Sequence, residues 1–387
     1  MPIDFHLSAN QLKLQQDARA FASQVLAGAS AVYDQKSTQA ERFQSLRPIY
    51  RTAVAAGLIK GQIPVPLGGT NESLVDASIV LEELYAADPS ATVTLAGTGL
   101  GLTPLIMSGN EKLQKEFLKP FLEAEEEGEP LASLVHSEPG GTANWLEKGG
   151  KGLQTTATRD GEDWVVNGEK LWTTNSSGWD GRGADLQCLV CRQSPEPGAP
   201  QHPDAEPSES IIVLLVTRKT ISSNPPSAYT ILSEPELSGN PATSGPHTRY
   251  TNLRVPSSQV LAIGKPAADL IVSSLLASAA LVGIFSVSIM RKAFDLALEF
   301  AKEDDRNGSV KLIERQSVAD LLTSLKIRID SSRLMAWKGL FALEQGGSEE
   351  KGMEGRKEAC VEAKIFGSDN AMEKIFQLEE YSSTWAF

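Results

Sequence analysis

The apolar residues of this 387-residue chain change their spacing twice, and this change limits the folds that the chain can adopt. Up to about residue 128 they recur at helical spacing, as in "SLVDASIVLEELYAAD". From 129 to 262, short Thr- and Val-rich runs predict strands, and from 263 to 387 the helical spacing returns. Strands that are not interleaved with helices form a sandwich or a barrel. We therefore predict an α+β multidomain protein with an all-helical domain at 1–128, a β domain at 129–262 and a helical domain at 263–387.

Turn residues divide the β region into strands. In "LQTTATRDGEDWVVNGEKLWTTN", Asp160-Gly161 and Asn167-Gly168 each predict a tight turn. The Pro-rich insert 194–208 is expected to be an exposed hairpin loop, and "HTRYTNLRVP" is expected to be the last strand.

Composition restricts the partners and the location. A net charge of −13 argues against nucleic acid or an anionic membrane as the main partner. The apolar stretch from Leu270 to Met290 contains serines, alanines and a glycine, so a buried helix is preferred to a membrane span. The ends of the sequence resemble no targeting signal, and we expect a cytoplasmic protein.

Cysteine usage gives no metal site. Cys188 and Cys191 have the spacing of half a zinc site, but the sequence offers no further ligands beside them. A buried structural strand is the preferred interpretation, and we expect no metal.

Two stretches combine aromatic residues with small polar ones. In "ASLVHSEPGGTANW", hydroxyl, amide and free backbone N–H groups around Gly140 could hold an anionic or heteroaromatic ligand. An Ω-loop with its own internal hydrogen bonds explains the same composition, and from composition alone it is the favoured interpretation. His136, by itself, suggests a structural histidine rather than a base. "GEKLWTTNSSGWD" raises the same choice between a flat ligand and a solvated turn.

Taken in order, the two stretches resemble motifs of the acyl-CoA dehydrogenase superfamily. "HSEPGGTAN" is similar to the "TEPxxGSD" motif, and "VNGEKLWTTN" is similar to "NGxKxWITN"; both motifs line a flavin in that superfamily. "RVP" and "DDRNGS…ERQSVADLL" also match. The resemblance implies a helical domain, a middle β-barrel and a C-terminal helical bundle. Within the superfamily, "GEKLWTTNSSGWDGRGADL" and "SGPHTRYT" most resemble the nitroalkane oxidases.

The resemblance implies FAD as the cofactor and assigns residues to it. Trp172 would pack on the isoalloxazine ring, with Thr173 beside it and the Thr174 hydroxyl near flavin N5. The pyrimidine edge would be lined by a run of four residues, Leu134, Val135, His136 and Ser137. The pyrophosphate would be reached by Thr142, Ala143 and Asn144.

The remaining implied residues lie in the C-terminal helical domain. Arg306 and Gln316 match positions that hold the FAD of a neighbouring subunit, which implies a homo-oligomer, a homotetramer by resemblance. An arginine suits such a contact because its guanidinium binds phosphate through two hydrogen bonds. Ser278 matches a helix serine beside the flavin and the catalytic base.

The chemistry implied is oxidation of a nitroalkane by O2 to an aldehyde or ketone, nitrite and hydrogen peroxide, begun by a carboxylate base. The family's catalytic Asp lies after the third C-terminal helix, in a segment with no counterpart in residues 1–387. The helix of Ser278 carries no acidic residue between Asp269 and Asp295. Three interpretations follow: an inactive nitroalkane oxidase with an incomplete C-terminal bundle, an acyl-CoA dehydrogenase-type enzyme, or a catalytically silent flavin-binding protein.

Overall fold

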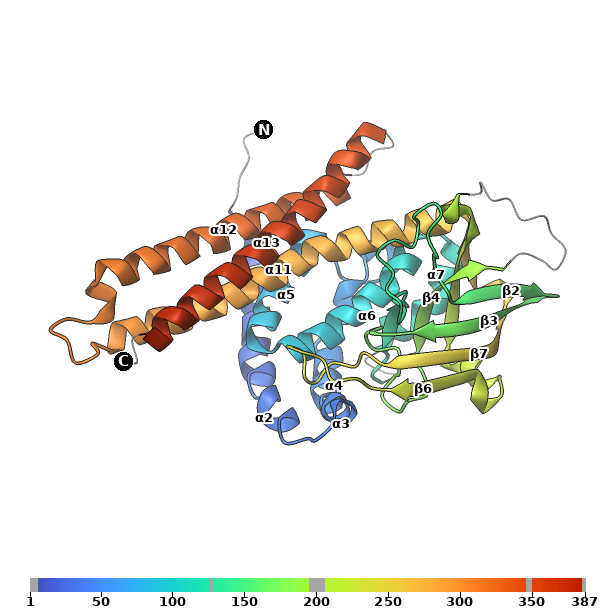
Figure 1. Ribbon diagram of the computed structural model, residues 1–387, viewed down its shortest axis with the longest axis horizontal. Helices are drawn as coiled ribbons and strands as arrows, with labels where there is room; N and C mark the ends of the chain where they lie inside the picture. The colour runs from blue at the N-terminus through green and yellow to red at the C-terminus, as the bar shows by residue number, and fades with distance from the viewer. Residues whose placement is uncertain (1–5, 125–127, 195–205, 346–349, 385–387) are drawn as a thin grey trace. The chain divides into compact units, whose positions relative to one another are not determined.

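A computed structural model of the protein describes residues 6–124, 128–194, 206–345 and 350–384. Helices occupy the chain as far as Leu122, strands lie between Ala132 and Ile263, and helices follow from Lys265 (Figure 1). This order confirms the predicted α+β class.

Contacts divide the chain into two compact units. The helical unit comprises residues 1–24, 73–88 and 275–387, and the sheet unit comprises residues 25–72 and 89–274. Both units are built from segments distant in sequence. These compact units are defined by packing contacts and do not test the domain boundaries predicted at 128 and 262, which stay predictions.

Eight strands of the sheet unit form one sheet (Figure 1). They are β1 (Ala132–Val135), β2 (Thr156–Asp160), β3 (Asp163–Lys170), β4 (Leu186–Gln193), β5 (Ile211–Thr217), β6 (Tyr229–Ser233), β7 (His247–Pro256) and β8 (Val260–Ile263). Their order is β6-β7-β3-β2-β4-β5-β8, with β1 paired to β4. We predicted a barrel, but in the described residues the strands form a sheet with β6 at one end of its order and β8 at the other. β4 and β5 are buried along almost their whole length, which explains the apolar runs at 188–191 and 211–216.

Two of the turn predictions have different outcomes. Asp160-Gly161 joins β2 to β3, with Asp160 opposite Asp163 and Gly161 at a φ of 62°. Asn167-Gly168 is not a turn, because both residues lie inside β3, where the pairing with β7 shifts register. A Cβ on Gly168 would lie 2.5 Å from the Thr155 Cα, so this glycine allows close approach of backbone.

The remaining predictions for the β region have mixed outcomes. The strand "HTRYTNLRVP" is β7, but it is not the last, because the short strand β8 follows and pairs with β5. Most of the predicted hairpin loop at 194–208 lies outside the described residues. The two cysteines of the "CLVC" sequence are buried in β4, as expected for a structural strand.

The helices of the sheet unit lie in the chain either before β1 or between later strands. They are α2 (Ala29–Tyr33), α3 (Gln39–Ser45), α4 (Arg47–Ala55), η2 (Lys60–Gln62), η3 (Val65–Leu67), α6 (Pro89–Met107), α7 (Glu111–Phe117), α8 (Lys119–Leu122), η4 (Pro207–Ser210), α10 (Arg218–Ser222), η5 (Pro226–Ala228) and η6 (Ser257–Gln259). α6 lies against β1 so closely that a Cβ on Gly101 would be 2.2 Å from the backbone nitrogen of Ser133. Glycine is therefore required at this contact.

The helical unit contains most of α11 (Lys265–Glu303) and all of α12 (Gln316–Glu344) and α13 (Glu350–Thr384), the three longest helices in the described residues. Its other helices are α1 (Ala9–Phe21), α5 (Leu74–Ala87) and η7 (Leu312–Glu314), while the first ten residues of α11 belong to the sheet unit and the π-helical turn η1 (Ala22–Leu26) spans the boundary between units. The capping box of Ser8 and Gln11 starts α1 as its sequence indicates. Val287, Leu325 and Ala371 bring α11, α12 and α13 into one core.

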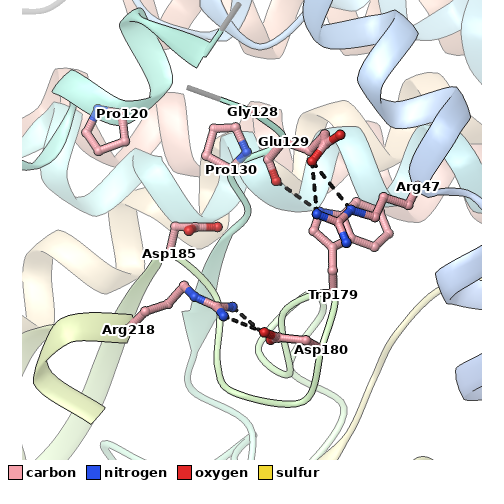
Figure 2. A pocket seen from close by; sticks show the side chains of 9 residues that line it. All are labelled: Arg47, Pro120, Gly128, Glu129, Pro130, Trp179, Asp180, Asp185 and Arg218. Atoms are coloured by element: carbon pink, nitrogen blue, oxygen red, sulfur yellow. Dashed lines mark hydrogen bonds and ion pairs between the residues drawn. The ribbon is translucent and has the colours of Figure 1, made fainter. Parts of the chain in front are cut away.

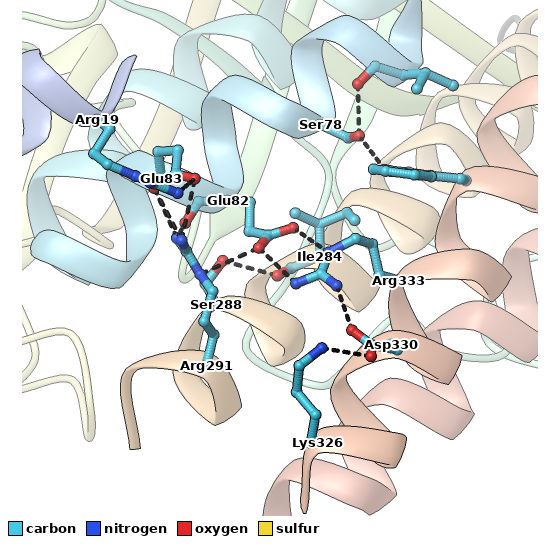
Figure 3. Close-up of polar contacts among 12 residues, drawn as sticks. Arg19, Ser78, Glu82, Glu83, Ile284, Ser288, Arg291, Lys326, Asp330 and Arg333 are labelled. Atoms are coloured by element: carbon cyan, nitrogen blue, oxygen red, sulfur yellow. Dashed lines mark hydrogen bonds and ion pairs between the residues drawn. The ribbon is translucent and has the colours of Figure 1, made fainter. Parts of the chain in front are cut away.

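A buried ionic network ties these helices together (Figure 3). Glu82 and Glu83 of α5 are both buried. Glu83 accepts from Arg19 of α1 and Arg291 of α11, and Glu82 accepts from Arg333 of α12. Because the carboxylates are desolvated, each requires these cationic partners.

Two helices, α6 and α11, are long and apolar enough to cross a membrane by length and composition alone. More than half of the apolar window of α6 is buried within the protein, and somewhat less than half of that of α11. The prediction of a helix over 270–290 is confirmed, but it is half-buried rather than fully buried.

Candidate flavin site

The two polar stretches singled out from the sequence meet at one end of the sheet. The backbone N–H of Leu171 donates to the carbonyl oxygen of Ser137 at 3.0 Å. Lys170, the last residue of β3, donates from Nζ to the carbonyl of His136 at 2.8 Å and to the Glu138 carboxylate at 3.0 Å. The loop after β1 and the loop after β3 therefore form one continuous site.

Trp172 has the most unusual conformation in this site. Its φ is 59°, in the left-handed region that bulky residues avoid, and its side chain is 59% exposed. Backbone strain of this kind costs of the order of 1–3 kcal/mol and is found mainly where function requires it. A large aromatic ring held in a strained conformation toward solvent fits a residue that stacks on a flat ligand.

The three residues that follow Trp172 are held by hydrogen bonds and by packing against α6. Thr173 is buried and shares a hydrogen bond of 2.8 Å with Ser176. Thr174 is half-buried, and its methyl group lies where a Cβ on Gly97 of α6 would clash at 2.7 Å. Asn175 donates from Nδ2 to the Thr94 carbonyl at 2.8 Å. The glycine cluster "GTGLGL", which lacks a dinucleotide fingerprint, thus lets α6 support the loop.

His136 is buried at the centre of the other loop. Burial, with a further contribution from the charge of Lys170, lowers the pKa of His136 to about 3, so its ring is neutral near pH 7. Its ring packs edge-on against Trp145 at 4.8 Å between centroids. The buried Nε2 atom has no hydrogen-bond partner in the described protein. A polar atom of this kind needs a partner, and a bound cofactor would fit.

The other residues assigned to the first loop differ in exposure. Leu134 and Val135 are buried in β1, and Ser137 is half-buried just beyond it. The three residues proposed for the pyrophosphate form an accessible stretch, half-buried Thr142 and exposed Ala143 and Asn144. All of them belong to the sheet unit, as do Trp172 to Thr174.

Three predicted residues belong to the helical unit. Ser278 is half-buried on α11, next to the buried Ala277. Arg306 is exposed in the loop after α11 at a φ of 51°, with its guanidinium 5.0 Å from the centroid of the Phe300 ring. Gln316 is the exposed first residue of α12 and donates to Asp320 at 2.7 Å. An exposed arginine at a helix-connecting loop is free to meet a ligand or another chain.

The structure adds residues that the sequence analysis did not assign. Glu138 and Lys170 form a buried ion pair inside the two motifs. Asn175 and Gly97 link α6 to the loop of Trp172. A lysine in a strand whose alternate residues are apolar was the available signal for the first pair.

A polar cavity of about 260 Å³ lies near the opposite end of β1 (Figure 2). Arg47 pairs with Glu129 and Arg218 pairs with Asp180, so both cations that line it are neutralised by carboxylates of the same wall. Burial raises the pKa of the third carboxyl, Asp185, which accepts from the Leu131 backbone N–H. This cavity offers no free cation for a phosphate. Among the described residues, no group of three or more His, Cys, Asp and Glu side chains could hold a metal ion.

The fold and these two interlocked loops are those of a flavoprotein class. The acyl-CoA dehydrogenase N-terminal domain matches residues 8–125 and the acyl-CoA dehydrogenase C-terminal domain matches residues 268–378. The chain therefore belongs to the acyl-CoA dehydrogenase family, and within that family to the nitroalkane oxidases, as its curated relatives show.

The chain is 52% identical to nitroalkane oxidase of Fusarium oxysporum, over 96% of this chain and 84% of that protein. It is 45% identical to nitroalkane oxidase of Podospora anserina, over 96% of this chain and 85% of that protein. A solved nitroalkane oxidase structure, an active-site serine-to-alanine variant crystallised with 1-nitrohexane, superposes with a TM-score of 0.93 at 51% identity, covering 97% of this chain and 86% of that one. These findings confirm the resemblance drawn from the motifs.

Proposed function

We propose that the chain is an FAD-dependent oxidoreductase of the nitroalkane oxidase kind; the full reaction of that kind converts a nitroalkane, O2 and water to an aldehyde or ketone, nitrite and hydrogen peroxide. The observation that carries the proposal is the hydrogen bond between Leu171 and Ser137, which joins the two flavin motifs into one site. Bound FAD supplies a two-electron acceptor that O2 reoxidises. Trp172 would hold its ring system, and His136, Ser137 and Thr174 would offer polar partners at its edges.

Binding of FAD is the first test of this proposal. The purified chain is expected to be yellow and to release a cofactor that runs as FAD rather than FMN. A colourless chain that cannot be reconstituted with FAD would contradict the proposal.

Removal of the substrate proton is the step for which we assign no base. Residues 1–387 offer no counterpart to the family's Asp segment, and Ser278 is a supporting residue that cannot remove the proton. General-base catalysis contributes about 10²–10⁴-fold. We therefore propose that residues 1–387 oxidise preformed nitronate, which needs no proton removed, but oxidise neutral nitroethane slowly or not at all.

The corresponding assay compares nitrite release from neutral nitroethane and from its anion. Nitronate turnover with little turnover of the neutral form supports the proposal. Rapid turnover of the neutral form would identify another base in the chain. Turnover of neither form, with FAD bound, would favour the catalytically silent flavin-binding protein. Reduction of an artificial acceptor by an acyl-CoA, without nitrite release, would favour the acyl-CoA dehydrogenase alternative, which the domain matches also allow.

Assembly into a homo-oligomer, a homotetramer by resemblance, is part of the proposal. Ile327, Leu334 and Phe341 of α12 are large, exposed and spaced seven residues apart, so they lie on one helix face. Exposed apolar stripes of this kind favour association. Light scattering of the chain and of the Leu334→Lys variant tests it: a stable monomer of the unchanged chain would contradict self-association. We further propose that the protein resides in the cytoplasm, which fractionation of the source cells can test.

A further inference from the structure

A buried ion pair lies directly behind the loops proposed for the flavin. The side chains of Lys170 and Glu138 are 0% and 3% exposed, and their charged atoms are 3.0 Å apart. Burying two charges is costly, and such a pair persists only where further hydrogen bonds satisfy both groups. The backbone groups that this pair binds therefore indicate a role beyond stability.

Three acceptors surround the lysine nitrogen. Besides Glu138, Nζ donates to the carbonyls of His136 and Val190, both at 2.8 Å. Burial lowers the pKa of Lys170 while the Glu138 carboxylate raises it. We take the lysine as charged because three acceptors require the three N–H donors of an ammonium, and a neutral amine has only two.

The glutamate is satisfied as well. Its two oxygens accept from the backbone N–H groups of Gln154 at 2.6 Å and Thr155 at 2.9 Å. Burial alone would raise the pKa of Glu138, but the charge of Lys170 and the two amides outweigh it and lower the pKa. The pair is therefore ionised and holds three separate backbone segments.

Lys170 binds at the point where the pairing of β1 with β4 stops. In this parallel ladder the N–H of Leu186 donates to the carbonyl of Leu131, and the register runs to Val135 opposite Leu189. Continuing the same alternation would bring the N–H of Ser137 to the carbonyl of Val190. That carbonyl instead accepts from Lys170, and the ladder ends.

The same lysine orients the peptide before Ser137. The His136 carbonyl points toward Nζ, and because the peptide is trans and planar, the N–H of Ser137 points the opposite way. In the described part of the chain this N–H donates to no protein acceptor. With Lys170 bound to these two carbonyls, the N–H of Ser137 is left available and points away from β3.

We propose that Lys170 is a positioning residue for the flavin: by binding the carbonyls of His136 and Val190, it keeps the backbone N–H of Ser137 available to a carbonyl oxygen on the pyrimidine edge of the cofactor. The inference rests on the proposed function, since it assumes that FAD occupies this site. It assigns Glu138 a different task, which is to neutralise the lysine charge and to hold the 154–155 backbone.

Three variants separate positioning from mere stabilisation. Lys170→Met keeps the length of the side chain but removes both carbonyl contacts, so we expect FAD affinity to fall about tenfold or more, the equivalent of a lost hydrogen bond. Glu138→Gln lowers stability but leaves Lys170 on both carbonyls, so FAD affinity should stay within about threefold of the unchanged chain. The double variant Lys170→Met/Glu138→Gln has no unpaired buried charge, and it should regain stability without regaining affinity.

The matched control is Gln114→Leu, which removes buried hydrogen bonds to the carbonyls of Leu105 and Ile106 in the same unit and leaves the hydrogen bonds of both loops in place. For each protein the Kd of FAD is measured by quenching of flavin fluorescence, the unfolding midpoint in urea is measured without FAD, and the absorption spectrum of the bound flavin is recorded. An affinity that tracks the urea midpoint across all variants would overturn the proposal, as would a Lys170→Met variant that binds FAD normally. If Lys170→Met does not fold, the double variant decides. Failure of the unchanged chain to bind FAD would instead refute the proposed function.

Discussion

Arg333 and Glu82 form a two-point ion pair inside the helical unit, with Nε 2.8 Å from Oε2 and Nη2 2.9 Å from Oε1 (Figure 3). The pair joins α12 to α5 across a desolvated contact, and Arg291 lies 3.2 Å from the same carboxylate. Its strength therefore depends on both partners being present.

Arg333→Met is expected to destabilise the chain by about 3 kcal/mol, the lower end for a broken buried pair, because Arg291 still faces Glu82. Arg333→Met/Glu82→Leu should recover most of this loss, because no unpaired charge stays buried there. Urea unfolding measures both. A double variant weaker than the sum of the two single changes would show that shape, rather than charge, holds the helices together.

Acid should weaken the Glu83 contacts. Burial by itself would raise the pKa of Glu83, but its bonds with Arg19 and Arg291 outweigh burial and lower the pKa. Its stabilisation is thus complete above the unfolded pKa of about 4.3 and is lost as the pH falls through the lower folded value.

The test is the difference in urea midpoint between the unchanged chain and Glu83→Gln, which should be largest at pH 7 and shrink below about pH 4.3. Glu344 provides the opposite control, because burial raises its pKa and the sign of the trend reverses. A Glu83→Gln difference that is constant with pH would contradict the prediction.

Trp172→Gly should separate cofactor affinity from stability. Glycine relieves strain of about 1–3 kcal/mol, but burial of the less exposed part of the ring is lost, so the apo chain should change by less than about 2 kcal/mol. FAD affinity should fall about a hundredfold, because an aromatic side chain buries about 150–250 Å² when fully covered. Trp172→Phe, which keeps a ring in the strained position, serves as the control. Equal affinity of all three proteins would exclude stacking on Trp172.

Gly97→Ala and Gly355→Ala should have opposite signs. Both glycines lie inside helices, where alanine gains up to about 1 kcal/mol in propensity. A Cβ on Gly355 meets nothing within 4 Å, whereas one on Gly97 lies 2.7 Å from Thr174 and 3.1 Å from Asn175. Overpacking costs about 1–3 kcal/mol, so Gly97→Ala should be net destabilising and should also weaken FAD binding. Urea unfolding and flavin titration measure both effects.

Much of the fold and of the cofactor site could be predicted because the signals are local. Helical and strand periodicities are read within windows of ten to twenty residues, and the two loops are marked by their own composition. Asn167-Gly168 misled because the same dipeptide that favours a turn also serves a bulge, and only the approach of Thr155 distinguishes them.

The Lys170–Glu138 pair shows what sequence alone withholds. The two residues are 32 positions apart, and the burial that makes them a pair arises only when the folded sheet brings Lys170 of β3 to Val190 of β4 and to the loop after β1. The compact units could not be predicted for a related reason: residues 73–88 pack with segments beyond 275, which are distant in sequence. Periodicity indicates which face of an element is buried but does not identify the element that covers it.

The position of β1 in the sheet has a consequence for the order of folding. In the part of the chain that the structure describes, β1 pairs with β4 alone, in parallel, across 54 residues of sequence, whereas β2 and β3 are joined by a hairpin. Contacts between distant segments form slowly because a long loop must close first. We therefore expect the loop of His136 and Ser137 to take its shape late, after the β2–β3 hairpin has formed and β4 has been placed. We expect the cofactor to bind at the end of this sequence, so that its binding energy stabilises the segment that forms last.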